Sequence, residues 1–381
     1  MTIEWKPLAA RLSGQLRALG SIQTEEWAGA FASVPRHLFV PRYWALNEFN
    51  APSALIDGAN PDQATTWLEA VYSNQFLLTQ WAYEGDIRTA TSSASLPSLV
   101  AGMLEHCEIK PNDRVLEIGT GSGYNTALLC AVVSGENVTT VDVDGLLVAE
   151  AESRLAQLGY FPNCMTGDGA GGVASHAPYD VILSTCAAAR IPEAWIDQVK
   201  PGGRIVSPFT YSGVLVKAVK DQDGMVSGQF CPEPMYFMPM RPSVQDRTTA
   251  TVPMPNHLDA PVTGSMPTQI PIEAWDDINW RLWLSLFLPD SQVAMSLTED
   301  ADPRPTGVIV YTDADRADCD ADTGIASYGR DRLWHTVEAA WSLWQSYDQP
   351  DRTRLGITAI PGERQWVWLD QPDSALNWDI H

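Results

Sequence analysis

Short apolar runs alternate with amphipathic segments through the middle of the chain, between residues 114 and 208. The runs are rich in β-branched residues, as buried strands are, and the segments between them carry helical spacing. We expect strands at 115–118, 138–143, 164–166, 179–184 and 204–208, and helices at 124–133, 145–158 and 193–198. This alternation predicts a parallel sheet with helices on both faces, extended by antiparallel strands at 214–219 and 229–240.

The N-terminal part shows helical periodicity before this alternation begins. Residues 5–20 and 24–33 are expected to be helices, and 96–107 a third helix with Pro97 in its first turn. The stretch 34–41 is bounded by prolines, so no helix is expected there, and residues 50–65 read as a loop.

Beyond residue 242 the composition changes. Residues 243–270 are rich in proline and threonine with little periodicity, which is typical of a linker. The rest predicts helices at 275–287 and 332–347, and strands at 307–311, 324–328, 355–360 and 365–369. We therefore expect a catalytic domain at 1–242, a linker at 243–270 and a small α+β domain at 271–381.

That C-terminal part is acidic and rich in aromatic residues. It has no lysine, since the last one is Lys220, and it holds nine of the fifteen tryptophans. Disordered acidic tails lack aromatic residues, so this part is expected to fold. Exposed tryptophans would suit peptide recognition, whereas buried ones would simply form the core.

Charge and cysteine content exclude several classes of function. A net charge of −23 argues against nucleic acid or an anionic membrane as partner. No apolar stretch approaches the roughly 20 residues of a membrane span, and the N-terminus lacks a signal-peptide pattern, so a cytoplasmic protein is expected. The six cysteines are scattered without a Cys-x-x-Cys pair, which predicts free thiols and no metal site.

The most informative motif is Val115–Tyr124, Val-Leu-Glu-Ile-Gly-Thr-Gly-Ser-Gly-Tyr. An apolar strand runs into a turn with Gly119, Gly121 and Gly123, and a helix follows. In a Rossmann-like α/β sheet this turn presents backbone N–H groups to a nucleotide-like ligand.

Acidic residues stand at the ends of successive predicted strands. Glu117 precedes the glycine loop, Asp142 ends the next strand, and Asp168 lies between Gly167 and Gly169. Carboxyl ends of parallel strands meet at one edge, where a carboxylate can accept the ribose hydroxyls of an adenosine. This arrangement favours S-adenosylmethionine over NAD, because the loop lacks the later glycine of the dinucleotide motif. The alternative is that these acids cap helices or turns.

Several motifs in order resemble the protein-L-isoaspartate O-methyltransferase family over residues 5–242. They are Val34-Pro-Arg-His-Leu-Phe-Val-Pro41, Ser95-Leu-Pro-Ser-Leu-Val-Ala101, Val115–Tyr124, Gly167-Asp-Gly169, Thr185–Ala189 with Ile191-Pro192, and Lys200-Pro-Gly-Gly-Arg-Ile-Val206. The resemblance implies S-adenosylmethionine as cofactor and a peptide carboxylate as methyl acceptor.

The resemblance also implies roles for individual residues. Ser95 takes the position of the family's active-site serine, although a serine before a helix can also be its N-cap. From their chemistry we further expect Arg36 and Arg190 on the acceptor side as counter-charges, and also His37, which can instead be a core or loop-bracing residue. The other acceptor-side candidates are Tyr72, Asn74 and Ser93. The cofactor is expected to contact Glu117, Gly119, Thr120, Gly121, Ser122, Gly123, Asp142, Val143, Gly167, Asp168, Gly169 and Thr185.

The chain departs from the family pattern on the acceptor side. Leu96 replaces the glutamine of the Ser-Gln-Pro motif, Ser93-Ala94 replaces Thr-Ile, and Asn74-Gln75 replaces an Asp-Arg pair. Together with the C-terminal part, these changes resemble the methyltransferases of ribosomal peptide maturation, including lanthipeptides. There an aspartate side chain is methylated, and attack by the neighbouring backbone nitrogen gives an aspartimide and then isoaspartate.

Three hypotheses follow. The chain is a methyltransferase of peptide maturation, a general isoaspartate repair methyltransferase, or a cofactor-binding scaffold without catalysis. The strand-end acids disfavour the last.

Overall fold

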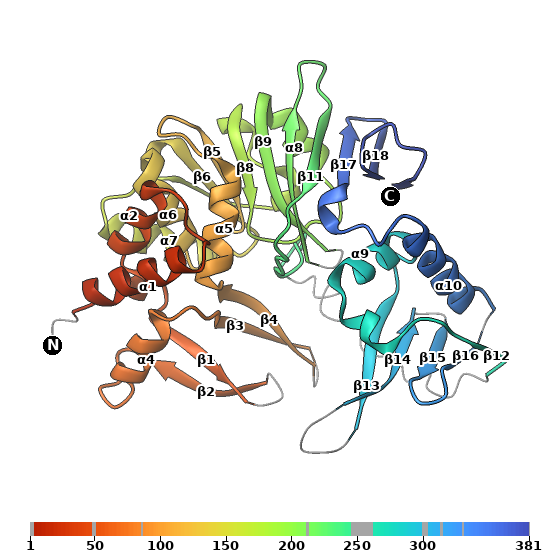
Figure 1. The fold of residues 1–381 in the computed structure, drawn as a ribbon. Coiled ribbons are helices and arrows are strands. Elements are labelled where there is room, and N and C mark those ends of the chain that lie inside the picture. The colour runs from red at the N-terminus through yellow and green to blue at the C-terminus, as the bar shows by residue number, and fades with distance from the viewer. Residues whose placement is uncertain are drawn as a thin grey trace.

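The computed structural model describes residues 4–47, 51–84, 87–210, 213–244, 262–298, 304–312, 315–329 and 331–380. It contains three sheets, and Figure 1 shows the largest between the N-terminal helices and the C-terminal region. The ten strands of the large sheet follow the order β19-β18-β17-β11-β10-β9-β8-β5-β6-β7.

The large sheet has a parallel half and an antiparallel half. The strands β5 to β9 pair in parallel and the others antiparallel, so the predicted α/β fold is confirmed. The strands are β5 Val115–Ile118, β6 Val138–Asp142, β7 Asn163–Thr166, β8 Tyr179–Ser184, β9 Val199–Phe209, β10 Val214–Lys220, β11 Val226–Phe230, β17 Leu355–Ile360, β18 Arg364–Leu369 and β19 Asn377–Asp379. Strand β11 is shorter than the predicted 229–240 and begins earlier.

The two faces of this sheet belong to two separate hydrophobic cores. On β5, Val115 faces one core while Leu116 and Ile118 face the other, as the period of a strand requires. Helices α1, α2, α5 and α6 cover the first face, and α8 packs on the second. The helices are α1 Lys6–Ala18, α2 Glu25–Ser33, α5 Pro97–Cys107, α6 Tyr124–Val133, α7 Gly145–Gln157 and α8 Glu193–Gln198, close to the predicted ones.

A second, four-stranded sheet precedes α5, and none of its strands was predicted. It has the order β2-β1-β3-β4 and lies beside the helix α4. Its elements are α3 Arg36–Phe39, β1 Arg42–Leu46, β2 Pro52–Asp57, α4 Ala64–Val71, β3 Leu77–Glu84 and β4 Ile87–Ala94. Two predictions are therefore wrong: 34–41 contains a helical turn that Pro35 precedes, and 50–65 contains β2 and the start of α4. Strand β2 forms because β1 pairs with it, which local sequence does not show.

The C-terminal region contributes a third sheet and two helices. The sheet has the order β12-β16-β15-β14-β13. The elements are β12 Gly264–Pro267, α9 Ile278–Phe287, β13 Gln292–Leu297, β14 Pro305–Tyr311, β15 Arg316–Asp320, β16 Ile325–Tyr328 and α10 Asp331–Ser346. Strand β12 lies inside the predicted linker, of which residues 245–261 fall outside the described residues.

Sheet pairing crosses the predicted boundary at residue 242. Strand β17 pairs with β11, from Val226 opposite Ala359 to Gln229 opposite Gly356. The predicted hairpin between β17 and β18 is present, but it extends the large sheet instead of a sheet of its own.

The tryptophans of the C-terminal region are mostly buried. Trp280, Trp283 and Trp334 have no exposed surface, and Trp280 lies 5.0 Å from Trp341 between ring centroids. They belong to the same core as Trp195 under the large sheet. These tryptophans therefore form a hydrophobic core, which was one of the two interpretations of the sequence. They cannot recognise a peptide as exposed side chains, which was the other.

Candidate active site

The glycine loop lies where the order of the parallel strands reverses. Strand β5 is flanked by β6 on one side and β8 on the other, and such a switch point opens a crevice at the strand ends. Gly119 has a φ of +94°, and a Cβ there would lie 2.5 Å from Thr185 Oγ1. The Thr185 hydroxyl donates to the Gly119 carbonyl at 2.6 Å, so the loop and the end of β8 hold each other. Glycine is required at this position by conformation and by space.

Asp142 fixes the same loop from the end of β6. Its carboxylate accepts hydrogen bonds from Gly121 N at 2.8 Å and Asp144 N at 3.0 Å. Burial raises the pKa of Asp142, and the two backbone donors oppose that rise. Each carboxylate oxygen keeps a lone pair for a further donor, such as a ribose hydroxyl.

Glu117 lies behind the loop. Its buried carboxylate accepts from Asn125 Nδ2 at 2.7 Å, Thr126 Oγ1 at 2.5 Å and Thr140 Oγ1 at 2.7 Å. Desolvation raises the pKa of Glu117 to about 7, although the three hydrogen bonds lower it. The predicted direct contact with the cofactor is corrected: Glu117 ties β5 to α6 and β6 and so supports the loop from beneath.

Two adjoining cavities meet at Asp142. The Val143 cavity, of about 290 Å³, lies against β6 and the end of β8. The Ser95 cavity, of about 420 Å³, lies between the glycine loop and the segment before α5. Both volumes are near those of small-molecule sites. The predicted cofactor residues that line one or both are Gly119, Thr120, Gly121, Ser122, Asp142, Val143, Gly169 and Thr185.

Three more of the predicted cofactor residues lie outside the linings of both cavities. Asp168 is exposed, and its carboxylate accepts from Ala170 N at 2.9 Å, so it caps a helical turn, η2 Gly169–Gly171. Gly123 has a φ of +86°, and a Cβ there would lie 2.8 Å from the Ala151 side chain, so it lets α6 pack beside α7. Gly167 donates to the Asp142 carbonyl at 2.9 Å.

Ser93 and Ser95 both line the Ser95 cavity. Helix α5 begins at Pro97, its N-cap residue is Leu96, and Asn74 Oδ1 accepts from Ser98 N at 2.9 Å. The capping role that Ser95 could have filled thus belongs to Asn74. Among the described residues no hydrogen bond of the Ser95 hydroxyl is found, which leaves it for a ligand.

The other predicted acceptor-side residues support the site from outside the two cavities. Arg36 is fully buried, and its guanidinium donates to the carbonyls of Val71, Ser73, Gln75, Ala94 and Ser95. Burial lowers the pKa of Arg36 to about 10, so it stays charged at pH 7. The predicted role of Arg36 as a counter-charge is corrected: it holds the Ser95 segment against residues 71–75. Arg190 is exposed and lines neither cavity.

His37 and Tyr72 form a pair beside this arginine. His37 Nδ1 lies 2.7 Å from the Tyr72 hydroxyl. Burial lowers the pKa of His37 and raises that of Tyr72, so both are neutral at pH 7. Neither lines the Ser95 cavity, so the core alternative for His37 holds.

Several residues that line the cavities were missed. Arg241 lines the Val143 cavity with a buried Nη1 that has no partner among the described residues. Asn125 lines the Ser95 cavity with an unpaired buried Oδ1. Thr91 of β4 and Tyr236 of the segment after β11 complete the walls. Asn125 follows the glycine motif directly in α6, whereas Arg241, Thr91 and Tyr236 carry no motif and come from segments that the sequence did not place beside the loop.

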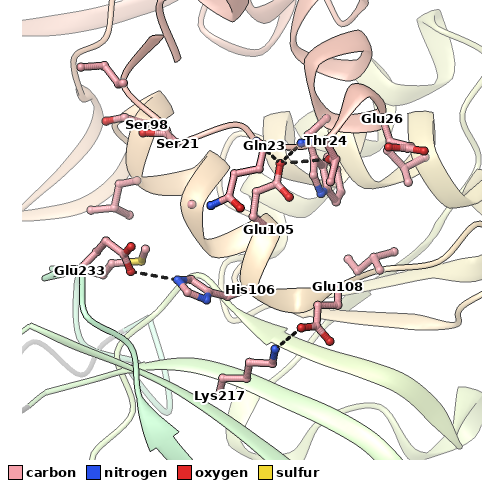
Figure 2. Close-up of a pocket in the computed structure, with 18 of the residues that line it drawn as sticks. Ser21, Gln23, Thr24, Glu26, Ser98, Glu105, His106, Glu108, Lys217 and Glu233 are labelled. Atoms are coloured by element: carbon pink, nitrogen blue, oxygen red, sulfur yellow. Dashed lines mark hydrogen bonds and ion pairs between the residues drawn. The ribbon is translucent and has the colours of Figure 1, made fainter. Parts of the chain in front are cut away.

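A third cavity, of about 840 Å³, is lined along α5 by Ser98, Glu105 and His106 (Figure 2). Its polar side chains are largely paired within the protein. Glu105 accepts from the start of α2, His106 contacts Glu233, and Lys217 donates to Glu108. These pairs join α5 and its C-cap residue Glu108 to three neighbouring segments and leave no distinct ligand chemistry, so the site is assigned to the Val143 and Ser95 cavities.

Comparison with known proteins identifies the family. The model of the family "Protein-L-isoaspartate(D-aspartate) O-methyltransferase (PCMT)" matches residues 9–243. The chain belongs to this family. It is therefore a protein carboxyl O-methyltransferase that depends on S-adenosylmethionine, as predicted.

Individual relatives agree with this. A protein-L-isoaspartate O-methyltransferase of Ignicoccus hospitalis is 34% identical over 233 residues, 59% of this chain and 93% of that protein. One of Pyrococcus horikoshii is 30% identical over 228 residues, 58% of this chain and 86% of that protein. A solved structure called protein-L-isoaspartate O-methyltransferase has a TM-score of 0.52 at 21% identity, with 95% of this chain and 99% of that chain covered. It shows that the fold, including most of the C-terminal region, occurs elsewhere.

The residues present fit the cofactor. Asp142 offers carboxylate lone pairs, Arg241 an unpaired buried donor, and Asn125 an unpaired buried acceptor, around the glycine loop.

In the described ranges no helix is long and apolar enough to cross a membrane. Over the same residues no group of three or more metal-ligating side chains is found, and the six cysteines are free.

Proposed function

We propose that the protein methylates the free carboxylate of L-isoaspartyl residues in proteins or peptides. The observation that carries this proposal is the Ser95 cavity, which Ser95, the glycine loop and Asp142 line together. A donor held by the loop and an acceptor held at Ser95 would thus lie in the same space. Three relatives that this chain covers over 85–93% of their length carry this enzyme name.

Methyl transfer requires the protein mainly to position the methyl donor and the acceptor carboxylate. Bound S-adenosylmethionine would supply a methyl group on a sulfonium. A carboxylate is ionised at pH 7 and already a nucleophile, so no general base is needed. The protein must orient the acceptor and exclude water. Ser95 would donate its hydroxyl to the acceptor carboxylate, and the N-terminus of α5 beside it favours a negative charge.

Methylation of a normal aspartate in a maturing ribosomal peptide is the second candidate. The substitutions on the acceptor side favour it, since Leu96 lines the Ser95 cavity where the family has glutamine. The C-terminal region does not distinguish the candidates, because a chain with the repair enzyme's name covers 95% of this one in fold.

A matched peptide pair tests the two candidates. The full chain is incubated with S-adenosylmethionine and a pair of peptides, one with an isoaspartyl and one with an aspartyl linkage at the same position. One such pair is linear and a second pair is cyclic. Mass spectrometry follows the gain of a methyl group and any later loss of methanol. Methylation of the isoaspartyl member alone is the expected result. Methylation of aspartyl members alone would replace the proposal with the second candidate, and cofactor binding without methylation of any peptide would refute both.

A further inference from the structure

One wall of the Ser95 cavity carries an aromatic side chain that is largely exposed. Tyr236 lines this cavity together with Ser95, and 59% of its surface is accessible. The other cavity-lining residues of its segment, Phe237 and Met238, are less exposed. An exposed tyrosine at the mouth of a cavity is suited to contact a peptide, because it offers a large apolar face and a polar end.

The position of Tyr236 depends on Gly213 at the start of β10. Gly213 has a φ of +63°, and a Cβ there would lie 2.5 Å from Tyr236 Cε1. The Gly213 carbonyl accepts a hydrogen bond from Met235 N at 2.7 Å. The ring of Tyr236 therefore lies directly on the backbone of Gly213, in a space that any other residue would fill.

The C-terminal region holds Gly213 in turn. Arg352 lies in the helical turn η6 Arg352–Arg354, is 2% exposed, and donates from Nη1 to the Gly213 carbonyl at 3.3 Å. Its Nε and backbone N both donate to Asn279 Oδ1 of α9, each at 3.2 Å. A charged, buried guanidinium with fixed partners is a rigid support, since hydrogen bonds from charged groups are the stronger ones.

We propose that Arg352 is a positioning residue that holds Gly213 and Tyr236 as the peptide-contacting wall of the Ser95 cavity. The inference rests on the proposed function, since it assigns part of the acceptor site to the C-terminal region. Tyr236 contacts the residues that flank the methylated one. Arg352 touches neither substrate nor cofactor and acts through Gly213.

A pair of glycine variants tests the contact with Tyr236. Gly213→Ala and Gly224→Ala both place alanine at a positive φ, +63° and +93°, but a Cβ at Gly224 has no neighbour within 4 Å. Both variants carry backbone strain, and only the first displaces the tyrosine ring. For Gly213→Ala we expect the KM for the methylated peptide to rise about tenfold, with kcat within about twofold and S-adenosylmethionine affinity unchanged. Equal KM values in the two variants would overturn the proposal.

A pair of arginine variants tests the role of Arg352. In Arg352→Met the Gly213 carbonyl keeps its bond from Met235 N, while the support from α9 is lost. The control Arg354→Met removes a partly exposed arginine of the same turn, which pairs with Asp370. We expect Arg352→Met to raise the peptide KM as Gly213→Ala does, Arg352→Lys to restore part of it, and Arg354→Met to leave it unchanged.

Each failure has a distinct signature. A wild-type protein that binds S-adenosylmethionine and methylates no peptide refutes the proposed function. A wild type that methylates peptide, with Arg352→Met folded by thermal unfolding and its peptide KM unchanged, refutes only the role of Arg352. If Arg352→Met does not fold, Tyr236→Ala decides: the ring is exposed, and an unchanged peptide KM in that variant overturns the proposal.

Discussion

The two walls of the Ser95 cavity are built in opposite ways. The glycine loop and Asp142 come from one βαβ stretch, and their hydrogen bonds span only 21 residues of chain. The acceptor wall combines Ser95, Tyr236 and, behind them, Arg36 and Arg352, whose bond to Gly213 spans 139 residues. The cofactor wall, by which we mean the glycine loop and Asp142, is thus local in sequence, whereas the acceptor wall depends on the packing of the whole chain.

The C-terminal region supports the acceptor wall and does not contact the glycine loop through the bonds described above. Its tryptophans and the second face of the large sheet share one core, and β17 pairs with β11. A change in that core can therefore reach the acceptor wall through Arg352 without touching the glycine loop. The comparison predicts that variants of the two walls separate into effects on cofactor affinity and effects on peptide use.

The largest effect is expected from removal of residues 243–381. The truncation exposes the edge of β11 and divides the core that both regions share, and each large side chain contributes about 1.5–3 kcal/mol when buried. We expect loss of soluble folded protein, measured by thermal unfolding and size-exclusion chromatography. A soluble truncated chain that methylates peptide as fast as the full one would contradict the shared core.

The next effect belongs to the cofactor wall. Asp142→Ala removes the acceptor of Gly121 N and the lone pairs proposed for the ribose. Hydrogen bonds that involve a charged group contribute about 1.5–3 kcal/mol each, so we expect S-adenosylmethionine affinity to fall at least about 100-fold by calorimetry. Asp168→Ala is the control, because Asp168 caps an exposed turn. In this variant the affinity for S-adenosylmethionine should fall at most about tenfold. Equal losses would contradict the geometry.

Glu117 gives the cofactor wall a pH dependence. Desolvation raises its pKa from 4.5 to about 7 in the folded state, so the folded protein binds the proton more tightly than the unfolded chain. This contribution to the free energy of unfolding is complete below about pH 4.5 and is lost as the pH rises to about 7. The contribution amounts to a few kcal/mol at most. Glu117→Gln should flatten that part of the pH profile of unfolding and destabilise by about 1–3 kcal/mol through a lost acceptor. A wild-type profile without this slope would contradict the assignment.

The parts that the sequence predicted well are those with local causes. The β5 strand, the glycine loop and α6 follow from periodicity and from the conformation that Gly119 must adopt. The small sheet did not follow, because β2 has an irregular burial pattern and forms only through its pairing with β1.

The same division holds for the site residues. Asp142 and Ser95 line the cavity because strand ends and helix starts converge there, whatever lies far along the chain. Arg36 and Glu117 were found by motif, but their role as supports depends on partners from other elements. Arg241 and Tyr236 had no local signal, since a lone arginine or tyrosine after a strand is usually a surface residue.

The smallest effect is expected at Ser95, where the two walls meet. Its hydroxyl is proposed to orient the acceptor carboxylate, which is already charged and needs no activation. Loss of one hydrogen bond to a charged carboxylate costs about 1.5 kcal/mol at the lower end of the usual range, so Ser95→Ala should lower kcat/KM for the peptide about tenfold and leave S-adenosylmethionine affinity unchanged. Ser98→Ala in the same helix is the matched control, because the Asn74 cap uses the backbone of Ser98 and not its hydroxyl. If Ser95→Ala weakens cofactor binding as well, the walls are not separable and the comparison fails; if only peptide use falls, the acceptor is held where the cavity places Ser95.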